Sequence, residues 1–194
     1  NKNLAKEGID KRKIFFTGNI MIDTLKKFIK GSKPRDILKK YGLKKNEFCL
    51  VTMHRPSNVD NIEVLGRLAR AIREISKSVK VIFPVHPRTS QKIKEFKLEK
   101  YFSTPSILLT EPIGYIETIA LTSTAKLVVT DSGGLQEEST YLKVPCLTMR
   151  ENTERPVTET EGTNTIIGTD TGLLLRKFRE IMKSKYKKGR LPKY

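Results

Sequence analysis

A short glycine turn separates an apolar run from a helical pattern in the second half of the chain. Residues 126–130 form the apolar run, which is typical of a strand buried on both faces. The turn is Asp131-Ser132-Gly133-Gly134, and a helix is expected over Leu135–Leu142 with Ser132 as its N-cap. A strand, a small-residue turn and a helix N-terminus can bind a phosphate through free N–H groups. An ordinary strand-to-helix turn with a capping serine would show the same pattern.

Both histidines of the chain follow predicted strands and stand close to an arginine. His54 precedes Arg55, and His86 is two residues before Arg88. An imidazole beside a guanidinium suits a diphosphate, and His54 could also donate or accept a proton near neutral pH. We therefore take His54 as the catalytic candidate. The alternative for His86 is a rigid turn in which the ring only caps backbone carbonyls.

A charged loop over residues 149–156 follows the fifth predicted strand. Arg150 and Arg155 could both reach the crevice beside the glycine turn, or they could pair internally with Glu151 and Glu154.

Two carboxylates begin the helix after the glycine turn. The helix dipole favours Glu137 and Glu138 there, and a carboxylate in this place could accept hydrogen bonds from ribose hydroxyls. No Walker motif, GxGxxG fingerprint, Ser-His-Asp triad or metal-binding carboxylate cluster is evident, so we expect neither a metal nor a cofactor.

From residue 46 onward, strand and helix patterns alternate, which predicts an α/β fold with a Rossmann-like, doubly wound parallel sheet of six strands. The strands are expected at Phe48–Met53, Val79–Val85, Ile107–Leu109, Leu127–Thr130, Cys146–Thr148 and Thr165–Ile167. The helices are expected at Ile62–Ile75, from a Ser90 cap through Phe96, at Tyr115–Leu121, at Leu135–Leu142 and at Thr171–Met182. Residues 1–45 read as a connector with a strand at Ile14–Thr17 and helices at Ile20–Ile29 and from Pro34 to about Tyr41.

The commonest strand order for such a sheet is 3-2-1-4-5-6. In that order the loops after strands one and four, residues 54–58 and 131–134, meet at the point where ligands bind. Strand four would also separate Cys49 from Cys146, so we expect reduced thiols in a cytoplasmic protein rather than a disulfide.

The composition describes a soluble domain with an unusual charge. The chain has 194 residues and a formal net charge of +17. No apolar run approaches the ~20 residues needed to cross a membrane, and no secretory signal opens the chain. A basic nucleic-acid-binding module is one interpretation of the charge. The lysines are dispersed without interleaved aromatic residues, so a solvated surface is the preferred one.

Several motifs together resemble the C-terminal domain of the non-hydrolysing UDP-N-acetylglucosamine 2-epimerases. They are TGN at 17–19, TMHRPSN at 52–58, PVHPR at 84–88, EPIGY at 111–115, TDSGGLQEE at 130–138, TERP at 153–156 and EGTN at 161–164. The resemblance implies the second half of a glycosyltransferase-B-type two-domain enzyme. It also implies interconversion of UDP-GlcNAc and UDP-ManNAc by elimination and re-addition of UDP.

The resemblance assigns roles to individual residues. Ser132, Gly133 and Gly134 would bind the diphosphate, and Glu138 would bind the ribose hydroxyls. The loop from Pro112 to Tyr115 would lie against the uracil.

It also implies that His54 and Arg55 face the phosphate and sugar end. His86 and Arg155 would serve the phosphate end or, with Arg55, a second, regulatory UDP-GlcNAc site.

The chain departs from the family pattern in three ways. Ser57 stands where the family often has an acidic residue. The N-terminal half, which would supply the catalytic carboxylates, is absent. The basic tail, residues 186–194, stops before an expected final helix.

We therefore expect residues 46–185 to be a UDP-binding domain that does not epimerise alone. The missing N-terminal domain of the same enzyme is its expected partner, and the resemblance suggests a homodimer. A glycosyltransferase of the same architecture remains the alternative enzyme.

Overall fold

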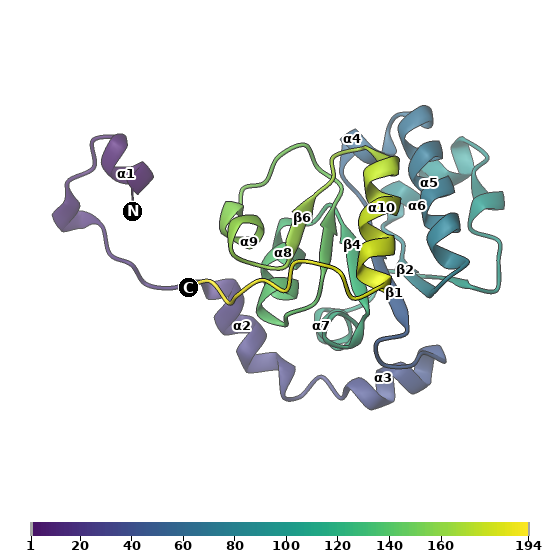
Figure 1. Ribbon diagram of the computed structural model, residues 1–194, viewed down its shortest axis with the longest axis horizontal. Helices are drawn as coiled ribbons and strands as arrows, with labels where there is room; N and C mark the ends of the chain where they lie inside the picture. Colours follow the sequence, from purple (N-terminus) through teal and green to yellow (C-terminus); the bar gives the residue numbers. More distant parts are fainter. Residues whose placement is uncertain (1, 194) are drawn as a thin grey trace.

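A computed structural model, which describes residues 2–193, contains a six-stranded parallel sheet (Figure 1). The strands are β1 (Phe48–Thr52), β2 (Lys80–Pro84), β3 (Ile107–Thr110), β4 (Leu127–Thr130), β5 (Cys146–Thr148) and β6 (Asn164–Ile166). Their order is β3-β2-β1-β4-β5-β6, so the predicted fold class and strand order are confirmed. The β1–β4 register pairs Cys49 with Leu127 and Thr52 with Thr130, which brings the ends of these two strands level.

The helices are distributed over both faces of the sheet and the connector. They are α1 (Lys2–Lys6), α2 (Ile20–Ile29), α3 (Pro34–Tyr41), α4 (Pro56–Val59), α5 (Ile62–Ser76), α6 (Pro87–Glu95), α7 (Tyr115–Thr124), α8 (Gly133–Tyr141), α9 (Pro156–Thr160) and α10 (Thr171–Met182). Two 3-10 turns, Lys11–Lys13 and Glu99–Tyr101, complete the set.

The two faces of the sheet bury separate apolar cores, because successive strand residues point in opposite directions. Cys49 and Val51 of β1 pack into the larger core with the apolar sides of α5 and α10. Phe48 and Leu50 pack into the second core, together with Leu121 of α7 and partly buried residues of α3. Both faces of the central strands are therefore covered, as a doubly wound sheet requires.

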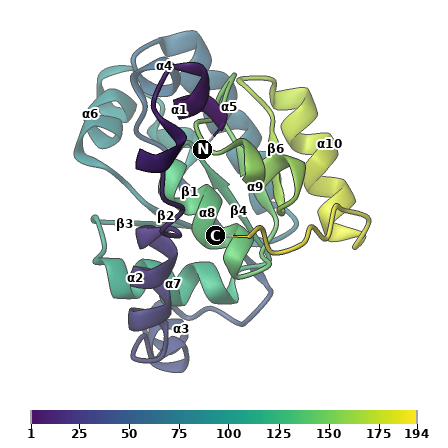
Figure 2. The same cartoon turned by 90° about the vertical axis from the view of Figure 1, so that its left-hand side faces the viewer.

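Helix α2, from the segment predicted to be a connector, packs against α7. Ile22 and Leu25 of α2 are buried in a small cluster with Ile119 of α7. Asn19 begins α2 by accepting a hydrogen bond from the Met21 N–H at 2.9 Å. The chain from α1 to α2 extends away from the body of the molecule in Figure 1, and in Figure 2 it lies in front of the body because that view looks at the side from which it extends.

Two expectations for single elements were wrong. Residues 14–17 are irregular backbone rather than a strand, and Phe15 and Phe16 are 77% and 61% exposed. Apolar residues alone do not make a strand, because the backbone also needs a neighbour with which to pair. Ser90 does not cap α6, which begins a turn earlier: Pro87 takes the first position and the His86 ring accepts the Arg88 N–H.

Hydrogen bonds hold the basic tail, residues 186–193, against the loops around α9 and β6. The Lys187 ammonium donates to the carbonyls of Glu159 and Asn164, and the Arg190 N–H donates to the Glu161 carbonyl at 2.7 Å. Both cysteines are buried free thiols in the described chain, as expected. No helix within residues 2–193 has the length and apolar character to span a bilayer.

Candidate functional site

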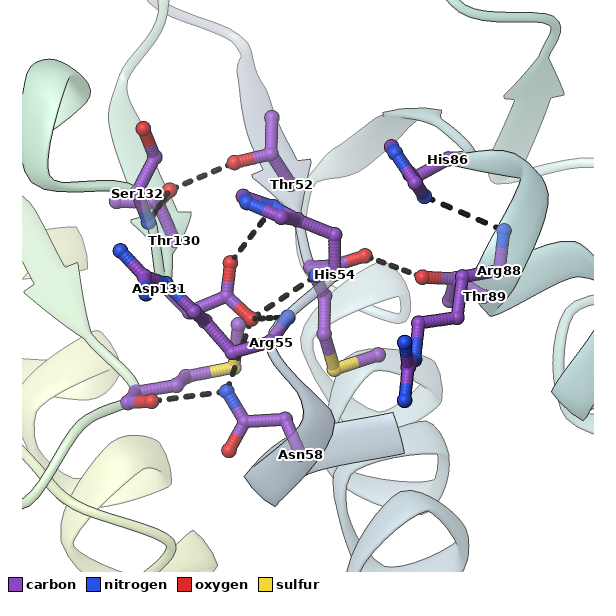
Figure 3. A network of polar contacts seen from close by, with 12 residues as sticks. Thr52, His54, Arg55, Asn58, His86, Arg88, Thr89, Thr130, Asp131 and Ser132 are labelled. Carbon is purple, nitrogen blue, oxygen red and sulfur yellow. Dashed lines mark hydrogen bonds and ion pairs between the residues drawn. The ribbon is translucent and has the colours of Figure 1, made fainter. Parts of the chain in front are cut away.

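The ends of β1 and β4 meet at the carboxyl edge of the sheet (Figure 3). The hydroxyl oxygens of Thr52 and Thr130 lie 2.6 Å apart, and the Ser132 N–H donates to the Thr130 hydroxyl at 2.9 Å. The loops after the two strands therefore leave side by side and then diverge. This is the junction that the strand order predicts as a ligand site.

A buried carboxylate joins the two loops. Asp131 has no exposed surface, and its Oδ2 accepts the N–H groups of His54 and Arg55 at 2.9 and 2.8 Å. The same oxygen accepts from Asn58 Nδ2 at 3.0 Å, and Asn58 also donates to the Met149 carbonyl at 2.9 Å. Burial alone would raise the pKa of Asp131, but the donors from His54, Arg55 and Asn58 together hold it below its ordinary value.

His54 is held by this carboxylate. Its Nδ1 lies 3.1 Å from Asp131 Oδ1, and the side chain is 39% exposed. The hydrogen bond to Asp131 raises the pKa of His54, while burial and the Arg55 charge oppose the rise. With Nδ1 committed to Asp131, Nε2 is the nitrogen left to exchange a proton with a ligand.

His86 lies beside His54 but has a different neighbourhood. The ring centroids are 5.5 Å apart and the planes are tilted by 34°. His86 Nδ1 accepts the Arg88 N–H at 3.2 Å, so the ring caps an amide rather than the carbonyls expected of a rigid turn. The reason is that a helix N-terminus presents N–H groups. The Arg88 guanidinium turns to Asp60, at 2.9 Å from Nε to Oδ1.

The first turn of α8 is open. Ser132 is the N-cap residue, as predicted, but its hydroxyl makes no capping bond among the described residues. A Cβ at Gly133 would meet only Glu154 Oε2, at 3.9 Å, within 4 Å in that part of the chain. A Cβ at Gly134 would lie 3.4 Å from Met21 Cε. The glycines thus keep space above N–H groups that have no intrahelical partner, which suits an anion.

The charged loop after β5 lies beside this helix end. Arg150 Nη2 lies 2.9 Å from Glu154 Oε1, and Arg155 Nε lies 3.6 Å from Glu137 Oε1. Glu151 instead accepts the backbone N–H of Thr169 at 3.1 Å. Both sequence interpretations hold in part, because the arginines are ion-paired and still lie at the crevice.

The acidic residues of α8 are paired with other elements. Glu138 is buried, and its Oε1 accepts the Tyr115 hydroxyl at 2.9 Å. Burial raises the pKa of Glu138 and the nearby charge of Glu137 adds to this, whereas the Tyr115 bond opposes it. Glu137 Oε1 accepts Asn19 Nδ2 at 2.8 Å, which ties α8 to the connector.

A hollow of about 170 Å³ opens beside the two histidines. Among the residues that line it are Thr52, His54, His86, Pro112 and Thr118. Pro112 is therefore brought to the histidines. Tyr115, from the same predicted loop, lines a separate groove with Phe28.

Sequence reasoning missed two residues that organise the site, Asp131 and Asn58. The available signal was an acidic residue directly after a buried strand at the switch point, facing a loop with an amide side chain. No cluster of three or more potential metal ligands occurs within residues 2–193.

Comparisons with known proteins agree with this geometry. Residues 1–193 match the family model described as UDP-N-acetylglucosamine 2-epimerase. The enzyme of that name from Methanococcus maripaludis is 42% identical over 188 residues, covering 94% of this chain and 51% of that protein. The one from Methanocaldococcus jannaschii is 39% identical over 196 residues, covering 98% and 53%. The chain thus spans about half the length of these relatives.

Solved structures show the same relationship. The M. jannaschii UDP-GlcNAc 2-epimerase in complex with UDP-GlcNAc and UDP superimposes with a TM-score of 0.88, covering 100% of this chain and 54% of that chain at 39% identity. The E. coli ADP-heptose heptosyltransferase II, at 12% identity and a TM-score of 0.57 over 80% of this chain and 52% of that one, shows the shared glycosyltransferase-B-type fold alone. The chain belongs to the UDP-N-acetylglucosamine 2-epimerase family.

Proposed function

We propose that this chain binds the UDP part of UDP-GlcNAc at the junction of β1 and β4. The observation that carries the proposal is the open first turn of α8 beside a histidine held by a buried carboxylate. The related enzymes from M. jannaschii and Neisseria meningitidis have been crystallised with UDP-GlcNAc, and an S. aureus relative with UDP. These complexes support a nucleotide sugar as the ligand.

In this proposal the diphosphate lies on the N–H groups of Gly133 and Gly134 and accepts the Ser132 hydroxyl, which makes no capping bond, because the Ser132 N–H already donates to Thr130. Arg55 is its cationic partner. Glu138 accepts the ribose hydroxyls. It keeps one oxygen on Tyr115, which leaves Oε2 for the ligand.

The uracil enters the hollow lined by Pro112. Tyr115 then acts through Glu138 rather than by direct stacking, because it does not line that hollow.

His54 acts at the leaving phosphate. When UDP is eliminated from the sugar, negative charge builds on the bridging phosphate oxygen, and a proton on His54 Nε2 would neutralise it. Asp131 supports this role because it stabilises the imidazolium and fixes the ring. On re-addition of UDP the same nitrogen takes the proton back.

The complete reaction needs more than these residues provide. The relatives are about twice as long as this chain. We propose that a domain corresponding to their unmatched part supplies the carboxylates that act at C2 of the sugar. Residues 46–185 are then the UDP-binding domain, and residues 1–45 connect it to the N-terminal domain of the same enzyme. Alone, the chain binds UDP without forming UDP-ManNAc, and a measurable rate by the chain alone would contradict this.

The test is a UDP titration followed by amide chemical shifts, at low and moderate salt, with Gly133→Asp beside Gly133→Ala. We expect saturable shifts over residues 132–138. Affinity should fall about tenfold or more in Gly133→Asp, since a carboxylate there repels the diphosphate. Gly133→Ala should weaken binding less than Gly133→Asp, because a methyl group fits the protein there and adds bulk beside the diphosphate but no charge.

The same titration separates nucleotide binding from general attraction to polyanions. A DNA oligonucleotide should not displace UDP at moderate salt, since dispersed charge gives binding that falls steeply with salt. Equal responses to UDP and to DNA, unaffected by Gly133→Asp, would overturn the proposal and favour the basic-module interpretation.

A further inference from the structure

Three arginines and one glutamate gather over the first turn of α8. Arg150 lies 2.9 Å from Glu154, and Arg155 reaches the same helix through its pair with Glu137. The charges of Arg150, Arg55 and Arg155 all lower the pKa of Glu154, with the Arg150 hydrogen bond the largest cause. A carboxylate in this place is ionised at neutral pH, so Glu154 places a negative charge beside the anion site.

The position of the Glu154 carboxylate matters as well as its charge. Its Oε2 would be 3.9 Å from a Cβ at Gly133 and so lies beside the first residue of α8. The side chain is 63% exposed, and it is held by Arg150 alone among the interactions of the described residues. The Glu154 carboxylate is thus close to the proposed phosphate position, and its exposed side chain can move away from it into solvent.

The arginines have hydrogen-bonding capacity that Glu154 does not meet. Arg150 Nη1 and Arg55 Nε are buried, and neither has a partner within residues 2–193. A buried donor without an acceptor is costly, and one exposed carboxylate cannot satisfy donors on two sides of the crevice. A diphosphate carries more acceptor oxygens than a carboxylate and can reach both.

We propose that Glu154 is an internal substitute for the diphosphate, which the ligand displaces when it binds. This inference rests on the proposed function, because it concerns the same anion site. While the site is empty, Glu154 holds Arg150 over α8 and limits the repulsion among the arginines. On binding, the carboxylate swings into solvent and the diphosphate takes over the guanidinium. Because the contact between Glu154 and Arg150 must be broken, UDP binding is weaker than it would be without Glu154.

The test is the Kd for UDP, measured by calorimetry on this chain and on Glu154→Gln. We expect Glu154→Gln to bind UDP about three- to tenfold more tightly, because the diphosphate then displaces a neutral amide from Arg150 instead of an ionised carboxylate. The matched control is Glu95→Gln, another exposed glutamate in an ion pair, with Lys92 at 2.9 Å. It should leave the Kd unchanged.

Two further measurements make the outcome decisive. Arg150→Met should weaken UDP binding, and Glu154→Gln should no longer improve affinity in the Arg150→Met background, because the exchange runs through that guanidinium. With labelled glutamate, the Glu154 carboxyl resonance should move on saturation with UDP toward that of an exposed, unpaired side chain.

Weaker or unchanged UDP binding in Glu154→Gln, with wild-type binding intact, would overturn the inference alone. The first result would mean that Glu154 positions Arg150 for the ligand instead of competing with it. Absence of UDP binding in the wild type and in all variants would overturn the proposed function as well, so the two failures are distinguishable.

Discussion

Two carboxylates at the same crevice differ in how deeply they are buried and in how many groups bind them. Asp131 has no exposed surface, and its Oδ2 accepts three donors from the loop after β1. Glu154 is 63% exposed and pairs with one arginine four residues away. Both have pKa values below the ordinary range, but for different reasons: converging donors lower that of Asp131, and surrounding arginines lower that of Glu154.

The site therefore has a permanent part, which is Asp131 with the two loops that it joins, and an exchangeable part, which is the charged loop after β5. Asp131 joins the loops after β1 and β4, so the orientation of His54 is set by the fold before any ligand arrives. The loop after β5 holds its charges through contacts that a ligand can replace. A site that must bind UDP and release it again needs both kinds of part.

The largest effect is expected from removing the permanent carboxylate. Asp131→Ala leaves the N–H groups of His54 and Arg55 and the Asn58 amide without their acceptor, which should lower the free energy of unfolding by about 3 kcal/mol or more. Urea denaturation followed by circular dichroism measures this. Asp60→Ala, which breaks only an exposed pair with Arg88, should change stability little. Equal losses in the two variants would mean that Asp131 is not a structural hub.

A milder change, Asp131→Asn, should lower the pKa of His54. The neutral amide keeps one acceptor oxygen but no longer stabilises the imidazolium, so the cause of the raised pKa is gone. Titration of the His54 ring protons by NMR in the two proteins measures the change.

The same variant tests how the His54 contribution to the free energy of unfolding depends on pH. Because the folded-state pKa of His54 is raised, its contribution is complete below about pH 6.5 and is lost as pH rises through the folded pKa. Asp131→Asn should remove this loss. A His54 titration identical in both proteins would contradict the contact with Asp131.

Much of the fold was predictable because local patterns and chain topology point the same way. Apolar runs alternating with amphipathic helices require a parallel sheet, and the helices Ile20–Ile29 and Thr171–Met182 have the expected bounds. The strand order then placed residues 54–58 and 131–134 together without any side-chain information.

The errors at residues 14–17 and at Asp131 concern partners far away in sequence, whereas at Ser90 a nearby residue occupies the capping position. Residues 14–17 have the composition of a strand but no neighbour with which to pair, and Ser90 lost its capping place to His86. Asp131 looked like part of a turn. Its importance comes from three donors that lie more than 70 residues away, which local pattern does not reveal.

A smaller effect is expected at Tyr115, whose hydroxyl donates to Glu138 of α8. Tyr115→Phe removes the hydroxyl that donates to Glu138 but keeps the ring near Phe28, so stability should fall by about 1 kcal/mol. The pKa of Glu138 should rise further, because burial then acts without the opposing bond. Urea denaturation and carboxyl NMR test both. An unchanged Glu138 pKa would show that the hydroxyl contributes no stabilisation to the carboxylate.

The smallest effect on stability should come from Glu154→Gln, the same chemical change as Asp131→Asn on the other carboxylate. Water already solvates most of this side chain, and an exposed ion pair between neighbours on one loop contributes little to folding. We therefore expect an unchanged urea midpoint for Glu154→Gln and a lowered one for Asp131→Asn, measured side by side. A comparable fall in both would place Glu154 in the permanent part of the site. The expected difference would instead show that the protein stabilises its fold with one carboxylate and leaves the other free for exchange with a ligand.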